Sequence, residues 1–211
     1  MQRERNIIIN EECCTEFKYL LYKPNKDYKK KLPLIVFLHG AGERGNDLSL
    51  LKVHSIPNMF EGNVEYPCIV VSPQCKADSF WTAQIPQLKV FIDKIAEKYQ
   101  IDENCIHLTG VSMGGYGTWD LAMAYPDMFA SIVPICGGGM AWNAGVLKMP
   151  IRIYHGEADT VVNVRESIEM YESLKKTNDN VTLDIFPGVD HNAWDYAYND
   201  ELILWMLKQK K

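Results

Sequence analysis

Short runs of consecutive apolar residues alternate along the chain with longer segments whose apolar positions recur at helical spacing. The apolar runs cover 34–38, 68–71, 105–109, 132–135, 151–155 and 181–186. The helical segments cover about 84–100, 114–125, 164–176 and 196–209. A glycine or proline follows each apolar run within two residues, as expected where a strand gives way to a turn. The pattern therefore predicts short strands separated by amphipathic helices.

This order of elements predicts an α/β fold. Strands that are apolar at nearly every position are buried on both faces, which indicates a mostly parallel central sheet with helices on both faces. The first 30 residues are expected to add one or two antiparallel strands, one of them near 18–22. A length of 211 residues favours a single domain, 1–211. The short stretch between 135 and 151 leaves no room for a large lid.

The charge and hydropathy of the chain restrict the classes of partner that it can bind. The formal net charge is −5, which disfavours nucleic acid and anionic membrane surfaces. The nearest approach to a basic run, Lys29–Lys31, is interpreted as a solvated loop. No apolar run approaches the roughly 20 residues of a membrane-spanning helix. No secretory signal follows Met1–Arg5, so a cytoplasmic location is expected, or a secreted one if a leader had been removed.

The six cysteines are interpreted as reduced thiols. Three of them, Cys68, Cys105 and Cys136, lie in apolar runs typical of buried strands. The others are Cys13, Cys14 and Cys75. A chain of this length does not need disulfides to stabilise its core, and no pair has zinc-site spacing. We therefore expect neither a disulfide framework nor a metal site.

The strongest chemical motif is Gly110-Val111-Ser112-Met113-Gly114. It is a G-x-S-x-G sequence between a predicted strand and a predicted helix, the setting in which this motif presents a nucleophilic serine on a sharp turn. The glycines two residues before and two residues after the serine allow the strand and the helix to pack closely. A glycine-rich structural turn is the alternative, but its position in the chain favours Ser112 as a nucleophile.

A serine hydroxyl needs a base and an orienting acid, which in this kind of fold follow it in the order acid, then histidine. Asp159 follows the strand that ends at His155, and His191 follows the last clear strand. They are the predicted acid and base. Glu157 is the main rival for the acid, but it lies two residues nearer the strand end, where the loop has not yet turned toward the histidine, so Asp159 is preferred. Four other histidines are weaker candidates for the base: His39, His54, His107 and His155.

Acyl transfer also requires donors for the oxyanion of the tetrahedral intermediate. One predicted donor is the backbone N–H of Met113, directly after the nucleophile. The second is expected from the glycine-rich loop after the first apolar run, and is assigned to Ala41, with Gly42 as the alternative. Glu43 and Arg44 on this loop are interpreted either as part of the site entrance or as a structural brace.

Aromatic residues on loops at the carboxyl ends of strands are candidates for substrate contact. Trp81 follows an irregular stretch, and Trp142 follows three consecutive glycines. Either ring could stack on an aromatic acyl group or a sugar, or instead cover the edge of the core. The predicted substrate-binding residues are Gly42, Glu43, Trp81 and Trp142.

Four motifs together resemble those of bacterial α/β-hydrolase carboxylesterases. The nearest branch is the small esterases grouped with polyhydroxybutyrate depolymerase-like and feruloyl-esterase-like enzymes. The chain also resembles the catalytic domain of prolyl oligopeptidases and the phospholipase/carboxylesterase family. The resemblance spans about 32–195, and its motifs are His39–Gly45, Gly110–Gly115, His155–Asp159 and Asp190-His191.

The resemblance implies hydrolysis of carboxylic esters through an acyl-enzyme, without a metal or organic cofactor. Short-chain or hydroxycinnamoyl esters, including carbohydrate-linked ones, are the expected small-molecule substrates. The alternatives are a thioesterase, a lysophospholipase or a small-substrate serine peptidase, and a binding protein that kept the fold. Dienelactone hydrolases carry cysteine where this chain has Ser112, and prolyl oligopeptidases carry a propeller for which these residues hold no equivalent. The oligomeric state stays open.

Overall fold

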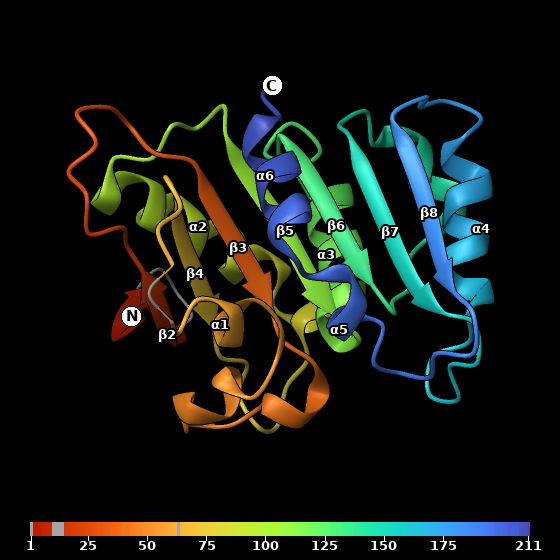
Figure 1. Cartoon of the computed structure of the whole chain (residues 1–211), viewed down its shortest axis with the longest axis horizontal. Coiled ribbons are helices and arrows are strands. Elements are labelled where there is room, and N and C mark those ends of the chain that lie inside the picture. The colour runs from red at the N-terminus through yellow and green to blue at the C-terminus, as the bar shows by residue number, and fades with distance from the viewer. Residues whose placement is uncertain (1, 10–14, 63) are drawn as a thin grey trace.

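The computed structural model describes residues 2–9, 15–62 and 64–211, and within these residues eight strands form one sheet in the order β1-β2-β4-β3-β5-β6-β7-β8 (Figure 1). The first two strands are antiparallel to each other, and β2 is antiparallel to β4. All pairs from β4 to β8 are parallel. The strands are β1 Arg3–Ile9, β2 Thr15–Tyr22, β3 Leu34–Leu38, β4 Ile69–Pro73, β5 Ile106–Val111, β6 Ser131–Ile135, β7 Ile151–Gly156 and β8 Val181–Phe186.

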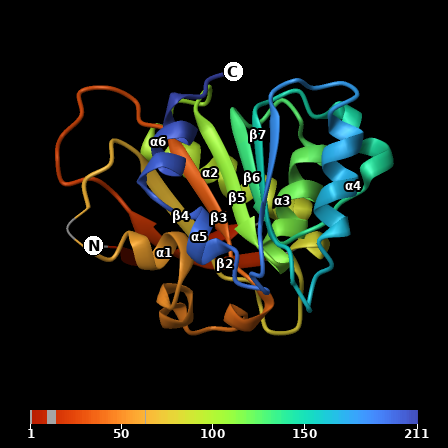
Figure 2. The same ribbon diagram turned by 45° about the vertical axis from the view of Figure 1, so that its right-hand side comes forward.

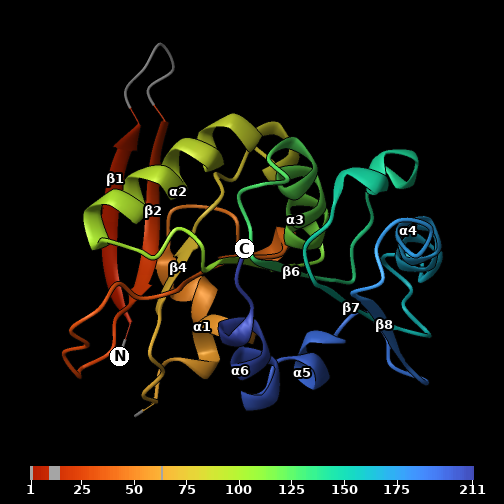
Figure 3. The ribbon, with the colours of Figure 1, turned by 90° about the horizontal axis from the view of Figure 1, so that it is seen from above.

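Helices cover both faces of this sheet, as Figure 3 shows from above. One face carries α2 (Ile85–Tyr99), α3 (Met113–Ala124) and α4 (Arg165–Leu174). The other carries α1 (Ser55–Met59), α5 (Trp194–Ala197) and α6 (Asp200–Lys208), which lie in front of the strands in Figure 2. Four 3-10 helices lie in the connections: η1 Ala41–Glu43, η2 Leu48–Lys52, η3 Trp81–Ala83 and η4 Ala141–Val146. The predicted parallel sheet with helices on both faces is confirmed.

The central strands are buried because both faces of the sheet are covered. All residues of β3, β4, β5 and β6 are buried, whereas β8 at the sheet edge is half exposed. The apolar stripe of α2, which packs on one face, consists of Leu88, Phe91, Ile92 and Ile95. This spacing places the four side chains on one side of a helix, which is why the segment forms an amphipathic helix.

The C-terminal segment differs from the single helix expected over 196–209. It forms two helices, α5 and α6, which are separated at Tyr198 and Asn199. Asn199 has an extended backbone, and its side chain accepts a hydrogen bond from the N–H of Leu202. An N-cap asparagine starts a new helix at this point, so the chain changes direction there.

The described cysteines are free and buried, in agreement with the prediction of reduced thiols: Cys68, Cys75, Cys105 and Cys136. Cys13 and Cys14 lie outside the described residues. None of the helices in the described part of the chain combines the length and the hydropathy that crossing a membrane requires.

Candidate active site

Ser112 lies on a sharp turn between β5 and α3. Its backbone has φ 54° and ψ −117°, a left-handed conformation that is costly for a residue with a side chain. The Ser112 N–H donates to the Ile135 carbonyl oxygen at 2.9 Å, which fixes the turn. A side chain at Gly110 would overlap the Gly114 carbonyl, and one at Gly114 would overlap the Leu38 carbonyl. The two glycines of the motif therefore allow the strand and the helix to approach closely enough to form this turn.

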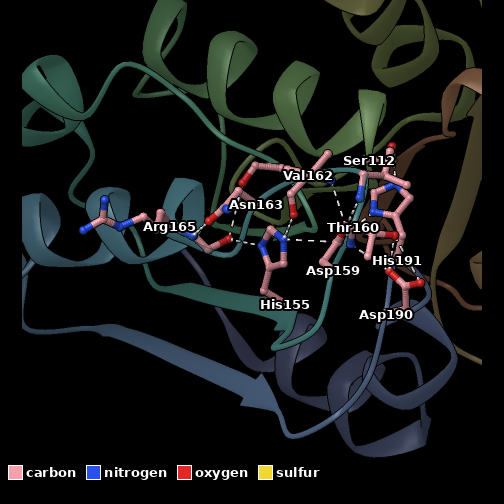
Figure 4. Close-up of polar contacts among 12 residues, drawn as sticks. Ser112, His155, Asp159, Thr160, Val162, Asn163, Arg165, Asp190 and His191 are labelled. Atoms are coloured by element: carbon pink, nitrogen blue, oxygen red, sulfur yellow. Dashed lines mark hydrogen bonds and ion pairs between the residues drawn. The ribbon is translucent and has the colours of Figure 1, made fainter.

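The structure brings the side chains of Ser112, His191 and Asp159 together in one hydrogen-bonded chain (Figure 4). The Ser112 Oγ lies 2.8 Å from His191 Nε2, and His191 Nδ1 lies 2.7 Å from Asp159 Oδ2. The three residues follow β5, β8 and β7, and the carboxyl ends of parallel strands meet at one edge of a sheet. Residues that are 79 and 32 positions apart in the sequence are thereby brought into contact.

Asp159 is held as a carboxylate although its side chain is fully buried. Its Oδ1 accepts hydrogen bonds from the N–H groups of Val161 and Val162, at 2.9 and 2.8 Å. Burial raises the pKa of this carboxyl, but hydrogen bonds from His191 and from the two N–H groups outweigh that effect, so the pKa is lowered. An ionised Asp159 can orient His191 and stabilise a positive charge on its ring.

A second histidine contacts the same carboxylate, a contact that no local sequence pattern predicts. The His155 Nε2 lies 3.3 Å from Asp159 Oδ2 and 2.9 Å from the Val162 carbonyl oxygen. Its Nδ1 lies 2.7 Å from the Ser167 hydroxyl. The available signal was its position at the end of a buried strand, four residues before Asp159. His155 has no nitrogen left for Ser112, which separates it from His191.

The loops that carry Asp159 and His191 are tied to each other. Asp190 accepts hydrogen bonds from the N–H and the hydroxyl of Thr160, at 2.8 and 2.9 Å. Glu157, the rival acid, accepts instead from the Gly188 N–H at 3.1 Å. The carboxylate of Glu157 is therefore directed to the loop after β8, and Asp159 is the acid that contacts His191.

The backbone groups predicted as oxyanion donors both begin helices. Ala41 is the first residue of η1, and Met113 is the first residue of α3. An N–H at the start of a helix has no intrahelical partner, and neither group donates to another backbone carbonyl among the hydrogen bonds of the described residues, so both can bind a ligand atom. A Cβ added to Gly40 would lie 3.7 Å from the Ser112 Cβ, so the η1 loop lies against the serine. Gly42 is exposed, with nothing within 4 Å of an added Cβ.

The rest of the η1 loop is joined to the His191 loop through an aromatic contact. Glu43 Oε1 lies 3.3 Å from His54 Nε2. The His54 ring stacks on Trp194 at 5.2 Å between centroids, and Trp194 meets the His191 ring edge-on at 5.4 Å. Both Glu43 and Trp194 therefore lie near the hydrogen-bonded chain of Ser112.

Trp81 was predicted to bind substrate, and this prediction is wrong. The side chain is 0% exposed and packs against Phe17 and edge-on against His39. Its Nε1–H donates to the His39 carbonyl oxygen at 2.9 Å. A large indole gains more from burial than from exposure on a loop when its N–H finds a partner in the core. Trp81 therefore stabilises the segment that leads into η1, through its hydrogen bond to His39, and does not contact a ligand.

The assignment of Trp142 as a substrate residue stays a prediction. It is 83% exposed on η4, where the neighbouring Ala141 accepts a hydrogen bond from Ser173 in the last turn of α4. The end of α4 near the active site is the first turn, where Ser167 contacts His155. Six residues of helix, about 9 Å, separate the two positions. The residue that precedes Trp142 therefore contacts the last turn of α4.

Cys136, His155 and Asp159 bring a thiol, an imidazole and a carboxylate within 4.8 Å of one another. Such a donor set could hold a metal ion. Here both nitrogens of His155 are engaged in hydrogen bonds, and Asp159 Oδ2 accepts from His191. A metal ion at this position would have to displace these hydrogen bonds.

The arrangement can carry out nucleophilic catalysis. The imidazole of His191 can take the proton of the Ser112 hydroxyl, and Asp159 can stabilise the imidazolium that results. The free N–H groups at the starts of η1 and α3 can receive the negative charge that develops on a carbonyl oxygen. This combination suits acyl transfer from an ester, a thioester or an amide.

Sequence comparisons match this chain to a hydrolase family and to a curated depolymerase. A family model described as phospholipase/carboxylesterase matches residues 55–200. Poly(3-hydroxyalkanoate) depolymerase C of Paucimonas lemoignei is 24% identical over 217 aligned positions, covering 81% of this chain and 52% of the depolymerase. The chain thus spans about half the length of this curated relative.

Solved structures share the fold. A thermostable esterase superposes with a TM-score of 0.85 at 32% identity, over 99% of this chain and 63% of that one. The feruloyl esterase module of Clostridium thermocellum, in complex with sinapinate, superposes with a TM-score of 0.67 at 18% identity. That match covers 92% of this chain and 83% of the module, and at such identity it shows the fold alone. The resemblance drawn from the sequence motifs is confirmed.

Proposed function

The chain belongs to the phospholipase/carboxylesterase family, and from this premise we propose that it is a serine esterase that hydrolyses carboxylic esters with Ser112 as nucleophile. The observation that carries the proposal is the hydrogen-bonded chain from Ser112 through His191 to Asp159, with contacts of 2.8 and 2.7 Å. A hydroxyl within hydrogen-bond reach of an imidazole, itself oriented by a carboxylate, is the arrangement that activates serine.

The first half of the reaction forms the acyl-enzyme. His191 Nε2 takes the Ser112 proton as Oγ bonds to the carbonyl carbon, and the carbonyl π electrons move onto oxygen. The N–H groups of Ala41 and Met113 donate to this oxyanion. The carbonyl then re-forms, the bond to the alcohol oxygen breaks, and His191 gives its proton to the leaving alcohol.

The second half releases the acid. Water attacks the acyl carbon while His191 Nε2 takes one of its protons, and a second tetrahedral oxyanion forms at the same donors. Its collapse breaks the bond to Ser112 Oγ, which recovers the proton from His191. Both halves use the same three side chains, so no other acid or base is required.

For the substrate, we propose short-chain esters first and hydroxycinnamoyl esters second. The likeness to enzymes that are named as a depolymerase and as esterases supports an ester. The hydroxycinnamoyl group is proposed by analogy with the feruloyl esterase module, with which this chain shares its fold. Residues 136–150, between β6 and β7, carry only the short helix η4, which favours easy access to Ser112 over a large lid.

Hydrolysis of p-nitrophenyl acetate tests the proposal. The wild-type protein should release p-nitrophenol, and the variant Ser112→Ala should release it no faster than buffer. Equal rates in both proteins would refute an esterase that uses Ser112. A panel of an acetate ester, methyl ferulate, an acyl-CoA, a lysolipid and an aminoacyl amide then ranks substrates by kcat/KM. A preference for the amide by orders of magnitude would instead favour a peptidase.

A further inference from the structure

The side chain of Arg44 joins the two loops that follow β3 and β4. Its Nε–H donates to the Ala41 carbonyl oxygen at 2.9 Å, and its Nη1 donates to the Ser79 carbonyl oxygen at 3.3 Å. The guanidinium carbon lies 4.8 Å from the centroid of the Phe80 ring, within the range of a cation–π contact. A planar guanidinium can make these three contacts at once, so Arg44 fixes the start of η1 against the loop after β4.

The other hydrogen bonds between these two loops fix the later part of the η1 loop. Gln74 Nε2 donates to the carbonyl oxygens of Glu43 and Asp47, at 2.9 and 2.8 Å. The Gly45 N–H donates to the Cys75 carbonyl oxygen at 2.9 Å. These bonds hold residues 43–47, whereas the bond from Arg44 reaches back to the first residue of η1.

The first residue of η1 needs such a restraint because little packing surrounds it. Ala41 is exposed, and a Cβ added to Gly42 would meet nothing within 4 Å. The Ala41 N–H is one of the two donors assigned to the oxyanion, and a donor of this kind must stay within about 0.5 Å of its productive position. A hydrogen bond from a charged group is stronger than a neutral one, so Arg44 can supply the restraint that packing does not.

We propose that Arg44 is a positioning residue, which holds the Ala41 N–H in place to receive the oxyanion of the tetrahedral intermediate. Its guanidinium contacts two backbone carbonyls and the Phe80 ring, so it acts through Ala41 and not by contact with the substrate. Charge on the carbonyl oxygen is greatest in the transition state, so loss of this restraint lowers kcat and leaves KM nearly unchanged. This inference rests on the proposed esterase function.

Kinetics with p-nitrophenyl acetate test the inference. In Arg44→Ala, kcat should fall by about tenfold, less than the roughly 10²-fold or more that is lost when an oxyanion donor is removed outright. Arg44→Lys keeps the positive charge but lacks the planar fork, so its kcat should lie between those of Arg44→Ala and the wild-type protein. A kcat in folded Arg44→Ala within about twofold of the wild-type value would overturn the inference.

A trifluoromethyl ketone distinguishes this role from a merely structural one. Ser112 Oγ bonds to the carbonyl carbon of trifluoroacetone, its proton passes to His191, and the carbonyl π electrons move onto the oxygen that the donors bind. The inhibition constant should therefore rise by about tenfold in Arg44→Ala while KM stays near its wild-type value. Neither constant depends on the fraction of protein that folds. A rise in KM with kcat unchanged would instead mean that Arg44 binds the substrate, which contradicts a positioning role.

Arg152→Ala is the matched control. The guanidinium carbon of Arg152 lies 4.6 Å from the centroid of the Trp205 ring, and its Nη1 lies 3.7 Å from Glu201 Oε1. Arg152 is the second residue of β7, so it lies at the opposite end of that strand from the edge that carries Ser112. Loss of this stacked arginine should leave kcat, KM and the inhibition constant unchanged. A fall in kcat as large as that in Arg44→Ala would overturn the inference.

The wild-type protein separates this inference from the proposed function. If it does not hydrolyse p-nitrophenyl acetate, the esterase proposal fails. If it hydrolyses the ester with Ser112 as nucleophile, and Arg44→Ala binds trifluoroacetone as tightly as wild type does, only the inference about Arg44 fails.

Discussion

Two histidines contact the same carboxylate oxygen, and their surroundings give them different capacities. His191 Nδ1 lies 2.7 Å from Asp159 Oδ2, and its side chain is 16% exposed, with Nε2 facing Ser112. His155 Nε2 lies 3.3 Å from the same oxygen, and its side chain is 0% exposed. The difference shows that a histidine does not become the catalytic base by contacting Asp159 alone. The base also needs a second ring nitrogen that can reach the nucleophile.

The difference follows from where each residue lies in the fold. His155 belongs to β7, so its ring is enclosed by α4 and by the loop after the strand, where Ser167 and Val162 occupy both nitrogens. Burial lowers its pKa, which keeps the ring neutral. His191 belongs to the loop after β8, at the sheet edge that carries Ser112. A loop position leaves the ring accessible to substrate and solvent.

The largest expected effect is that of His191→Ala. Without the base, the Ser112 hydroxyl keeps its proton, and kcat for p-nitrophenyl acetate should fall by about 10⁵-fold or more. Stopped-time assays at high enzyme concentration measure the residual rate, and circular dichroism checks that the variant is folded. A loss of less than tenfold would mean that another group activates the serine.

Asp159→Asn should have the next largest effect. The amide keeps the shape of the side chain but presents an N–H or a neutral oxygen to His191, so the ring is held in the wrong tautomer or loses its countercharge. We expect kcat to fall by about 10⁴-fold with KM little changed. If Glu157→Gln instead caused the larger loss, the assignment of the acid would be wrong.

His155→Leu should mainly affect stability. The change removes the partner of the half-buried Val162 carbonyl and leaves the buried Ser167 hydroxyl with only its longer contact to the Gly137 carbonyl, which should lower the free energy of unfolding by about 2 kcal/mol. Because Asp159 loses a neighbour, kcat should also fall, by about tenfold. Urea unfolding and steady-state kinetics measure the two effects. A loss of kcat as large as that in His191→Ala would contradict the distinction between the two histidines.

The buried histidines should also make stability depend on pH. Burial lowers the pKa of His107 from 6.5 to about 3. Below pH 6.5 the unfolded state binds protons that the folded state does not, so the free energy of unfolding falls as the pH falls. His107→Leu removes one such group. Between pH 7 and pH 5, its free energy of unfolding should therefore fall by about 2 kcal/mol less than that of the wild-type protein.

Urea unfolding of both proteins at pH 7, 6 and 5 checks this expectation. Burial also lowers the pKa of His39, to about 4, and this lowers the free energy of unfolding as the pH falls in the same way. The His107→Leu variant should therefore still lose some stability at low pH. Equal losses in wild type and in His107→Leu would show that His107 is protonated in the folded state as readily as in the unfolded one.

The residues that form the hydrogen-bonded chain could be located from the sequence because they follow a simple rule. Ser112, Asp159 and His191 each come shortly after an apolar run, and the carboxyl ends of parallel strands share one edge. The same runs predicted the parallel part of the sheet, since burial on both faces leaves a continuous apolar signal. Order along the chain and position relative to a strand were sufficient.

Other features depend on packing across long distances in the sequence, which local patterns do not encode. Trp81 follows an irregular stretch, as a binding residue on a loop would, yet its indole is fully buried against His39 and Phe17. The contact of His155 with Asp159 and the unsatisfied oxygen of Glu43 depend on side-chain geometry within the site. Glu43 and His155 lie near strand ends, which the sequence predicts, but their side-chain partners depend on the folded geometry.

Labelling with a fluorophosphonate tests the central claim most directly, because the reagent bonds only to a serine whose hydroxyl is activated. Peptide mapping by mass spectrometry should place the adduct on Ser112 in the wild-type protein, and His191→Ala should abolish labelling whereas His155→Leu should retain it. Labelling of another residue, or equal labelling of Ser112 in wild type and His191→Ala, would contradict the account.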